Sequence, residues 1–265
     1  MMNNANEISH HTKLYGFIGE SAGQSSISAT LNKLFKTENK NAMMIPMNIR
    51  EDDFFFTLLN MKKSHVNGAL ISNEYLKNLV EVLDEASEAV IQSGICDIVL
   101  RDGQKLIGDV LGMRVLAKFL KENGFKKVAL IGMDSRAKAF SSLAEALKIS
   151  YFHDNLEDLM LFCKEINMAD ADVNRIAEGM DIDFSVYDAV VDFSDFDSLN
   201  MASRLGGINL DMKSKKEFSP LKVRAHELES KYIGFDEMLN ELSIGIFEFL
   251  NEKKHLEDDK SDMKF

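Results

Sequence analysis

The chain has 265 residues, of which 45% are hydrophobic and 28% charged, as in a globular protein of one large domain or two modest ones. Its 43 acidic and 31 basic residues give a formal net charge of −12, which repels the phosphates of nucleic acids and of anionic membranes. Two cysteines are too few for a disulfide framework, and no segment has the roughly 18 apolar residues of a membrane span, so we expect neither nucleic acid nor membrane as a partner.

The first half of the chain alternates short apolar runs with amphipathic segments. Apolar runs that end at glycine or turn residues predict strands, and apolar residues at i, i+3 and i+4 predict helices. The dipeptide Asp102-Gly103 between two apolar runs predicts the turn of a β-hairpin. In chain order we predict a strand at 14–19, a helix at 29–35, a strand at 42–49, a helix beginning near Glu51, a strand at 68–72, a long helix at 75–93 and hairpin strands at 95–100 and 105–107.

The second half continues the alternation of strands and helices. The run 127–131 (KVALI) is apolar throughout and ends at a glycine, which indicates a strand covered on both faces. Such alternation predicts βαβ units with right-handed crossovers and a parallel sheet, and hence an α/β fold. We predict helices at 112–123, 136–147, 156–166 and 236–251, and strands at 127–131, 149–152 and 187–193.

These elements suggest two domains, and both ends of the chain are polar. Residues 1–13 lack the apolar core of a signal peptide, so we expect a mobile N-terminus and a cytoplasmic protein. A first domain is predicted over 14–107, with the helix 236–251 returning to it, and a second over 108–235. Residues 252–265 form a charged tail with little to bury.

Several local strings resemble the shikimate dehydrogenase family. The strand 15–19 (YGFIG) with the serine-containing loop after it, the strand 94–99 (GICDIV) with its Asp-Gly hairpin, the loop 105–109 (KLIGD) closed by Gly112, and the terminal helix around 238–248 are each similar to family motifs. The chain is thus identified as a divergent member. The resemblance implies an N-terminal mixed α/β substrate domain plus a Rossmann-like parallel-sheet domain, with NAD(P) as cofactor.

The family's catalytic pair is a lysine and the aspartate of an Asn-Thr-Asp-Gly loop, which together move the proton of the hydroxyl being oxidised. The resemblance places Glu74, or Asn73 in a register shifted by one residue, at the position of the lysine. It places Leu111 at the aspartate and Asp109 at the asparagine of the loop. The catalytic candidates are therefore Glu74, Asp109 and the nearby Lys77, with Glu74 or Asp109 as an alternative general base.

The family's substrate-contacting positions are partly retained. Ser25 matches the first serine of a Ser-x-Ser pair, and Ser28 reaches the second if the register slips by one residue. Asp97 stands where an asparagine is usual, and its charge would repel a substrate carboxylate. Leu242 replaces the glutamine of the terminal helix.

The dinucleotide loop of the family, Gly-x-Gly-Gly, keeps only Gly132 here. Glycines in such a loop let backbone amides approach a pyrophosphate at a helix N-terminus, and Asp134 instead adds negative charge there. Ser135 is a candidate cap for the helix, and Arg136 is a candidate anion contact. Asp154 lies about 20 residues beyond the loop, where an acidic residue holds a ribose diol and favours NAD over NADP.

Two functions follow from these patterns. The first is a non-classical or non-catalytic relative, a pseudoenzyme that binds a small hydroxy-acid-like ligand or a protein partner in the interdomain cleft. The alternative is an NAD(P)-dependent oxidoreductase acting on a shikimate- or quinate-like hydroxy acid. No set of histidines, cysteines and carboxylates has the spacing of a metal site, so we expect no metal.

Overall fold

The computed structural model describes residues 11–168, 170–213 and 217–262, and for 252–262 it gives the backbone alone. The chain divides into two compact units, unit 1 (Met1–Gly112 with Asn240–Phe265) and unit 2 (Met113–Leu239). The sequence predicted the corresponding limits after residues 107 and 235. Of the predicted mobile N-terminus, residues 1–10 lie outside the described residues, and so do residues 263–265 of the predicted tail.

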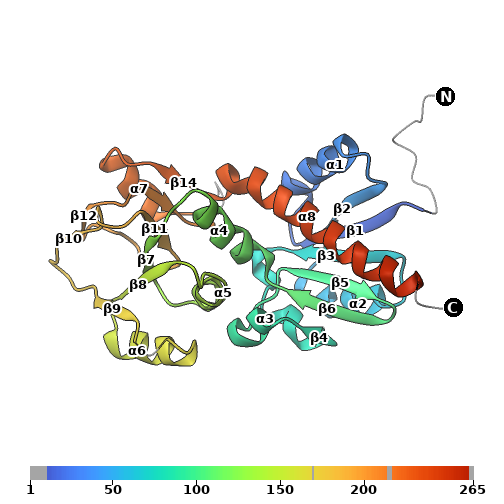
Figure 1. The fold of residues 1–265 in the computed structure, drawn as a ribbon, viewed down its shortest axis with the longest axis horizontal. Coiled ribbons are helices and arrows are strands. Elements are labelled where there is room, and N and C mark those ends of the chain that lie inside the picture. Colours follow the sequence, from blue (N-terminus) through green and yellow to red (C-terminus); the bar gives the residue numbers. More distant parts are fainter. Residues whose placement is uncertain (1–10, 169, 214–216, 263–265) are drawn as a thin grey trace. The chain divides into compact units, whose positions relative to one another are not determined.

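Unit 1 is a mixed sheet with helices. Its six strands lie in the order β2-β1-β3-β5-β6-β4, in which β5 runs antiparallel to β3 and to β6 and the other pairs are parallel. The elements, visible in Figure 1, are β1 (Lys13–Gly19), α1 (Ile27–Thr37), β2 (Ala42–Asn48), α2 (Glu51–Met61), β3 (Val66–Ile71), β4 (Glu85–Ala86), α3 (Glu88–Ser93), β5 (Ile98–Asp102), β6 (Lys105–Asp109) and most of α8 (Phe235–Asp262).

The long helix predicted over 75–93 is wrong. The segment contains two short 3-10 helices, Asn73–Tyr75 and Asn78–Val82, then strand β4 and the short helix α3. Strand β4 pairs with β6, and Ser87 caps α3 by accepting a hydrogen bond from the N–H of Val90. The apolar periodicity is real, but pairing with a distant strand interrupts the helix.

Unit 2 is built around a parallel sheet. Its elements are α4 (Leu111–Glu122), β7 (Lys127–Ile131), α5 (Ser135–Leu143), β8 (Lys148–His153), α6 (Leu156–Glu165), β9 (Asp172–Arg175), β10 (Ile182–Asp183), β11 (Ala189–Asp192), β12 (Ala202–Arg204), β13 (Ile208–Leu210), α7 (Pro220–Glu227) and β14 (Tyr232–Ile233). Six of the strands form an all-parallel sheet in the order β14-β13-β11-β7-β8-β9. The small strands β10 and β12 pair separately.

The strand order of unit 2 fixes where a ligand can enter. Chain order runs outward from β7 through β8 to β9 on one side, and through β11 and β13 to β14 on the other, which is the order of a doubly wound dinucleotide-binding sheet. The order reverses between β7 and β11, and ligands of such sheets bind at the carboxyl ends of the strands near this switch point. The predicted α/β fold with a Rossmann-like domain is confirmed.

A close-packed core holds the ends of these strands in place. On one face of the unit 2 sheet the buried residues form a single cluster, in which Phe152 and Phe184 meet edge to face with ring centroids 5.0 Å apart. The cluster comprises Ala129, Ile131, Phe152, Ile176, Phe184, Val190, Leu199, Ala202, Leu205, Leu221 and Ala225. Among the described residues, no helix is long and apolar enough to cross a membrane.

Candidate functional sites

The strand ends of unit 1 meet along one edge of its sheet. Backbone hydrogen bonds join them: the N–H of Ile71 donates to the carbonyl of Asp97 at 2.8 Å, and the N–H of Asp97 donates to that of Asp109 at 3.2 Å. Glu74 follows β3, Asp97 precedes β5, and Asp109 ends β6. The edge therefore brings together three of the carboxylates that the sequence singled out.

Asp97 caps helix α4. The N–H of Leu111 donates to its Oδ1 and the N–H of Gly112 to its Oδ2, each at 2.6 Å. Burial raises the pKa of Asp97 to about 6, the two amide donors lower it, and the charge of Asp109 adds to the rise. Both carboxylate oxygens are thus engaged by the helix terminus, a position that favours negative charge.

Asp109 and Glu74 are also held by their own surroundings. Asp109 Oδ1 accepts from the hydroxyl of Ser87 and from the N–H of Val110, both at 2.8 Å. Glu74 accepts from the N–H of Glu20 at 2.8 Å and from the hydroxyl of Ser72 at 2.5 Å. Glu74 therefore ties the loop after β1 to the end of β3.

The remaining candidates of unit 1 differ in their exposure. Lys77 is exposed at the start of the second 3-10 helix. Ser25 is half-buried, and its Oγ accepts from the N–H of Ile27 at 3.3 Å. Ser28 is buried, and its hydroxyl has no hydrogen-bond partner among the described residues. Leu111 and Leu242, which stand at family positions for polar side chains, are both buried.

In unit 2, Gly132 ends the first strand at the switch point. Its φ is +95°, and a Cβ there would lie 2.6 Å from the backbone nitrogen of Ser194. The close approach of β7 to the end of β11 therefore requires glycine.

Helix α5 begins with an aspartate cap. Asp134 Oδ1 accepts from the N–H of Arg136 at 2.8 Å and of Ala137 at 2.9 Å. Its Oδ2 accepts from Nε of Arg136 at 2.7 Å, and the guanidinium of Arg136 lies over the ring of Phe193, 5.6 Å from its centroid. Ser135 was predicted as the cap, and this is wrong: Asp134 is the N-cap, and Ser135 is the first helical residue. Aspartate before a helix is a strong cap signal that could have been recognised in the sequence.

Asp192, at the carboxyl end of β11, was not among the predicted site residues. It is 1% exposed, and its Oδ1 accepts from the N–H of Ser194 at 2.9 Å and from its hydroxyl at 2.6 Å. Its Oδ2 has no hydrogen-bond partner within the described part of the chain. Burial raises the pKa of Asp192 to about 6; the Ser194 donors and Lys213 lower it, and the charge of Asp211 adds to the rise.

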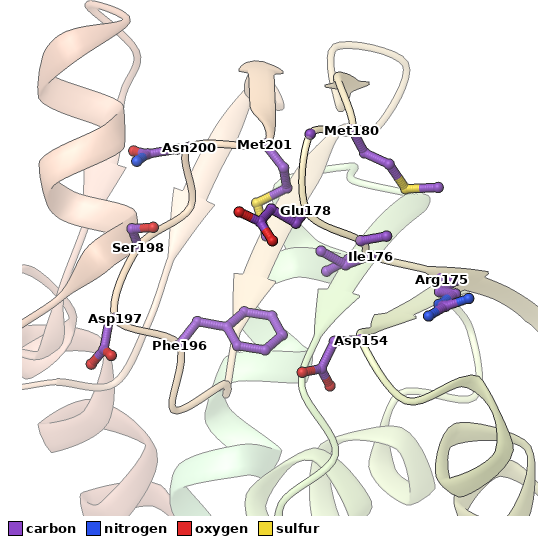
Figure 2. A pocket seen from close by; sticks show the side chains of 12 residues that line it. Asp154, Arg175, Ile176, Glu178, Met180, Phe196, Asp197, Ser198, Asn200 and Met201 are labelled. Atoms are coloured by element: carbon purple, nitrogen blue, oxygen red, sulfur yellow. The ribbon is translucent and has the colours of Figure 1, made fainter.

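Asp154 lies at a pocket on the carboxyl edge of the unit 2 sheet. The pocket has a volume of about 760 Å³, and Figure 2 shows the side chains around it. They come from the ends of β8 and β9 and from the loops after β9 and β11. The lining residues are Asp154, Arg175, Ile176, Ala177, Glu178, Gly179, Met180, Phe196, Asp197, Ser198, Asn200 and Met201.

No group of three or more histidines, cysteines, aspartates and glutamates among the described residues could hold a metal ion. The two cysteines are free and buried. Burial raises the pKa of Cys163 to about 11, which keeps this thiol protonated at neutral pH.

No protein-family model matches the chain, but curated proteins do. The chain is 28% identical over 138 residues to a shikimate dehydrogenase (NADP+) of Pyrococcus furiosus, a match over 51% of this chain and 50% of that protein. It is 26% identical over 136 residues to that of Carboxydothermus hydrogenoformans, over 50% and 49% of the two chains. The chain thus spans about half the length of the curated relatives it matches.

Solved structures extend the likeness to the whole fold. A shikimate dehydrogenase in complex with NADP+ matches with a TM-score of 0.70 over 89% of both chains at 16% identity. That of Aquifex aeolicus matches with a TM-score of 0.70 at 18% identity, over 93% of this chain and 95% of that one. The chain is a divergent relative of the shikimate dehydrogenases. A 5-ketofructose reductase of Gluconobacter also matches this chain, with a TM-score of 0.69 at 17% identity over 90% of this chain and 92% of that one.

The structure places most of the predicted residues in four locations. Three acidic side chains (Glu74, Asp97 and Asp109) share the edge of the unit 1 sheet, and Ser25 and Ser28 lie in and after the loop that follows β1. Gly132, Ser135 and Arg136 lie at or before the start of α5, with the unpredicted cap Asp134 among them. Asp154 lies at the pocket.

Proposed function

We propose that this relative of the shikimate dehydrogenases binds a small hydroxylated ligand without carrying out a nicotinamide-dependent oxidation. The observation that carries the proposal is the cap of α5. A dinucleotide pyrophosphate in this fold binds the free N–H groups at the N-terminus of the helix after the first strand. In this chain the N–H groups of Arg136 and Ala137 already donate to the carboxylate of Asp134.

Electrostatic repulsion also opposes a pyrophosphate at this helix terminus. Two unit charges of like sign 4 Å apart repel by about 4 kcal/mol at the effective dielectric of a protein surface. A diphosphate at α5 would meet the negative charge of Asp134, and the guanidinium of Arg136 is already paired with that aspartate. These residues do not fit the pyrophosphate of NAD or NADP.

The side chains at the family's catalytic positions in unit 1 are apolar, exposed or engaged in other contacts. A relay of the family's type needs an amine beside a carboxylate, so that each tunes the pKa of the other. Leu111 is buried and apolar, and Lys77 is exposed. Glu74 accepts hydrogen bonds from Ser72 and from the backbone of Glu20. These contacts support structural roles for the side chains at the catalytic positions.

A ligand of unit 1 would be recognised by hydroxyl contacts. The buried hydroxyl of Ser28 has no partner among the described residues, and a buried polar atom of this kind favours a hydrogen-bonding ligand group. Asp97 and Asp109 lie together at the edge of the unit 1 sheet, so we expect a neutral polyol to bind unit 1 better than a carboxylate anion does.

A second candidate function is an NAD-dependent oxidoreductase. One observation favours it: Asp154 follows β8 and lines a pocket at the carboxyl edge of the sheet, where an acidic residue can accept hydrogen bonds from a ribose diol. A structural neighbour was crystallised with shikimate and NAD. In this function Asp154 would favour NAD over NADP.

Turnover and binding separate the two functions. The absorbance of reduced nicotinamide is followed with NAD or NADP and either shikimate or quinate, with the Pyrococcus furiosus relative as positive control. Thermal shifts are measured in parallel with shikimate and its neutral methyl ester. We expect no turnover, and a larger shift with the ester that the Ser28→Ala variant reduces and the exposed-site control Ser26→Ala does not. Steady reduction of either dinucleotide would overturn the proposal.

A further inference from the structure

The walls of the unit 2 pocket combine an aromatic face with acidic groups. Phe196 and Met201 pack against the buried core cluster, which fixes both side chains, and Ile176 is a buried member of that cluster. Met180 is 44% exposed at the mouth. The ring of Phe196, with the thioether of Met201 and the aliphatic side chain of Ile176 packed on the same cluster, offers flat, polarisable surface, which suits a planar ring better than a sugar.

The charges around this surface are predominantly negative. The lining includes the carboxylates of Asp154, Glu178 and Asp197 and the guanidinium of Arg175. His153 lies beside this lining, with its Nδ1 3.0 Å from Oδ1 of Asp154 and its ring centroid 5.9 Å from that of Phe196. Figure 2 shows the carboxylates of Glu178 and Asp154 on either side of the Phe196 ring. A phosphate entering between them would be repelled, whereas a positive charge over the ring would be attracted by both the carboxylates and the π-face.

We propose that this pocket binds a planar aromatic cation. The ring stacks on Phe196, and its amino groups or ring charge lie between Glu178 and Asp154. A volume of about 760 Å³ accommodates a ligand of two or three fused rings, because small-molecule sites span roughly 300–1,000 Å³. Every residue that lines the pocket belongs to unit 2.

The test is a fluorescence titration of the full chain with proflavine, a planar diaminoacridine cation, and with anthracene-2-carboxylate, a planar anion of similar size. We expect saturable binding of proflavine alone, which weakens as salt is added. Phe196→Ala should raise the dissociation constant of proflavine at least about 5-fold, as expected for the loss of a stacking partner. Glu178→Gln and Asp154→Asn should each raise it about 3-fold.

Matched controls separate the pocket from the general negative charge of the chain. Phe218→Ala removes an aromatic ring that is 64% exposed and lies outside the pocket, and Glu145→Gln removes an exposed carboxylate outside it. Both variants should bind proflavine like the wild type. Equal binding of the anion, or equal effects of Phe196→Ala and Phe218→Ala, would overturn the proposal.

Discussion

The carboxylate of Asp134 lies 2.9 Å from the backbone nitrogen of Ala137, in the first turn of α5. This hydrogen bond satisfies one of the N–H groups that a helix leaves free at its start. Because a cap of this type typically contributes about 1 kcal/mol, Asp134→Ala should lower the free energy of unfolding by about that amount. Urea denaturation measures the change.

The matched control for this cap is the neighbouring serine. Ser135 is the first helical residue and does not cap the helix, so Ser135→Ala should change the free energy of unfolding by less than about 0.5 kcal/mol. A larger loss from Ser135→Ala than from Asp134→Ala would show that the cap is assigned to the wrong residue.

The second prediction concerns Gly112 in the cap of α4. A Cβ at this position would lie 2.9 Å from Oδ2 of Asp97, which is tighter than real contacts. Gly112→Ala should therefore displace the carboxylate and cost about 1–2 kcal/mol of stability, although alanine is the better helix former. Gly23→Ala, whose added Cβ would meet only Asn48 at 3.5 Å, should have a much smaller effect on the midpoint of urea unfolding.

The third prediction is a pH dependence from Asp192. Its pKa is raised from 3.8 to about 6 in the folded state, so between these values the native state binds more protons than the unfolded state. Stability therefore falls as pH rises through this window. Because one pKa unit corresponds to about 1.4 kcal/mol, Asp192→Asn should stabilise the protein by roughly 3 kcal/mol at neutral pH.

Chemical denaturation at several pH values tests this. Asp97 titrates in the same pH window, so the Asp192→Asn variant should keep part of the dependence of stability on pH. The neighbours that act on Asp192, Lys213 and Asp211, remain in place. The control Asp195→Asn removes an exposed carboxylate and should leave the pH profile as it is. An Asp192→Asn variant that is less stable than the wild type at neutral pH would mean that the charge is compensated in the native protein.

Local signals in the sequence predicted much of the fold. The Asp102-Gly103 turn is determined by its own residues, because Gly103 has a φ of +59°, which glycine adopts readily. The hairpin between β5 and β6 forms where it was expected. The apolar run of β7 is likewise buried between its neighbours, β8 and β11. The order of the elements suggested two domains, and the family resemblance implied the same architecture.

Pairings between distant segments account for the failures. Asp84 accepts a hydrogen bond from the N–H of Leu106 at 2.7 Å and thereby holds residues 84–86 beside β6, so the helical pattern of 75–93 is broken by a partner about 20 residues away. Strand β13, with three residues, and β14, with two, are too short to give a periodic signal, and they form because β11 provides an edge.

The sequence predicts one feature of the candidate sites, the cap by Asp134, better than another, the burial of Asp192. The cap by Asp134 follows from one residue and the helix after it, and a stricter analysis of the sequence would have predicted it. The burial of Asp192 depends on how β7, β11 and β13 assemble, and no local pattern distinguishes it from an exposed aspartate at a strand end.

We expect Asp134 to close the start of α5 to a pyrophosphate, and a calorimetric titration with NADP and with NAD measures whether it does. The wild type should show no binding in the micromolar range to either dinucleotide. The Asp134→Gly variant, which frees the N–H groups of Arg136 and Ala137, should gain measurable affinity, and Ser135→Ala should not. Micromolar binding of a dinucleotide by the wild type would show that Asp134 leaves the start of α5 open, and it would favour the oxidoreductase.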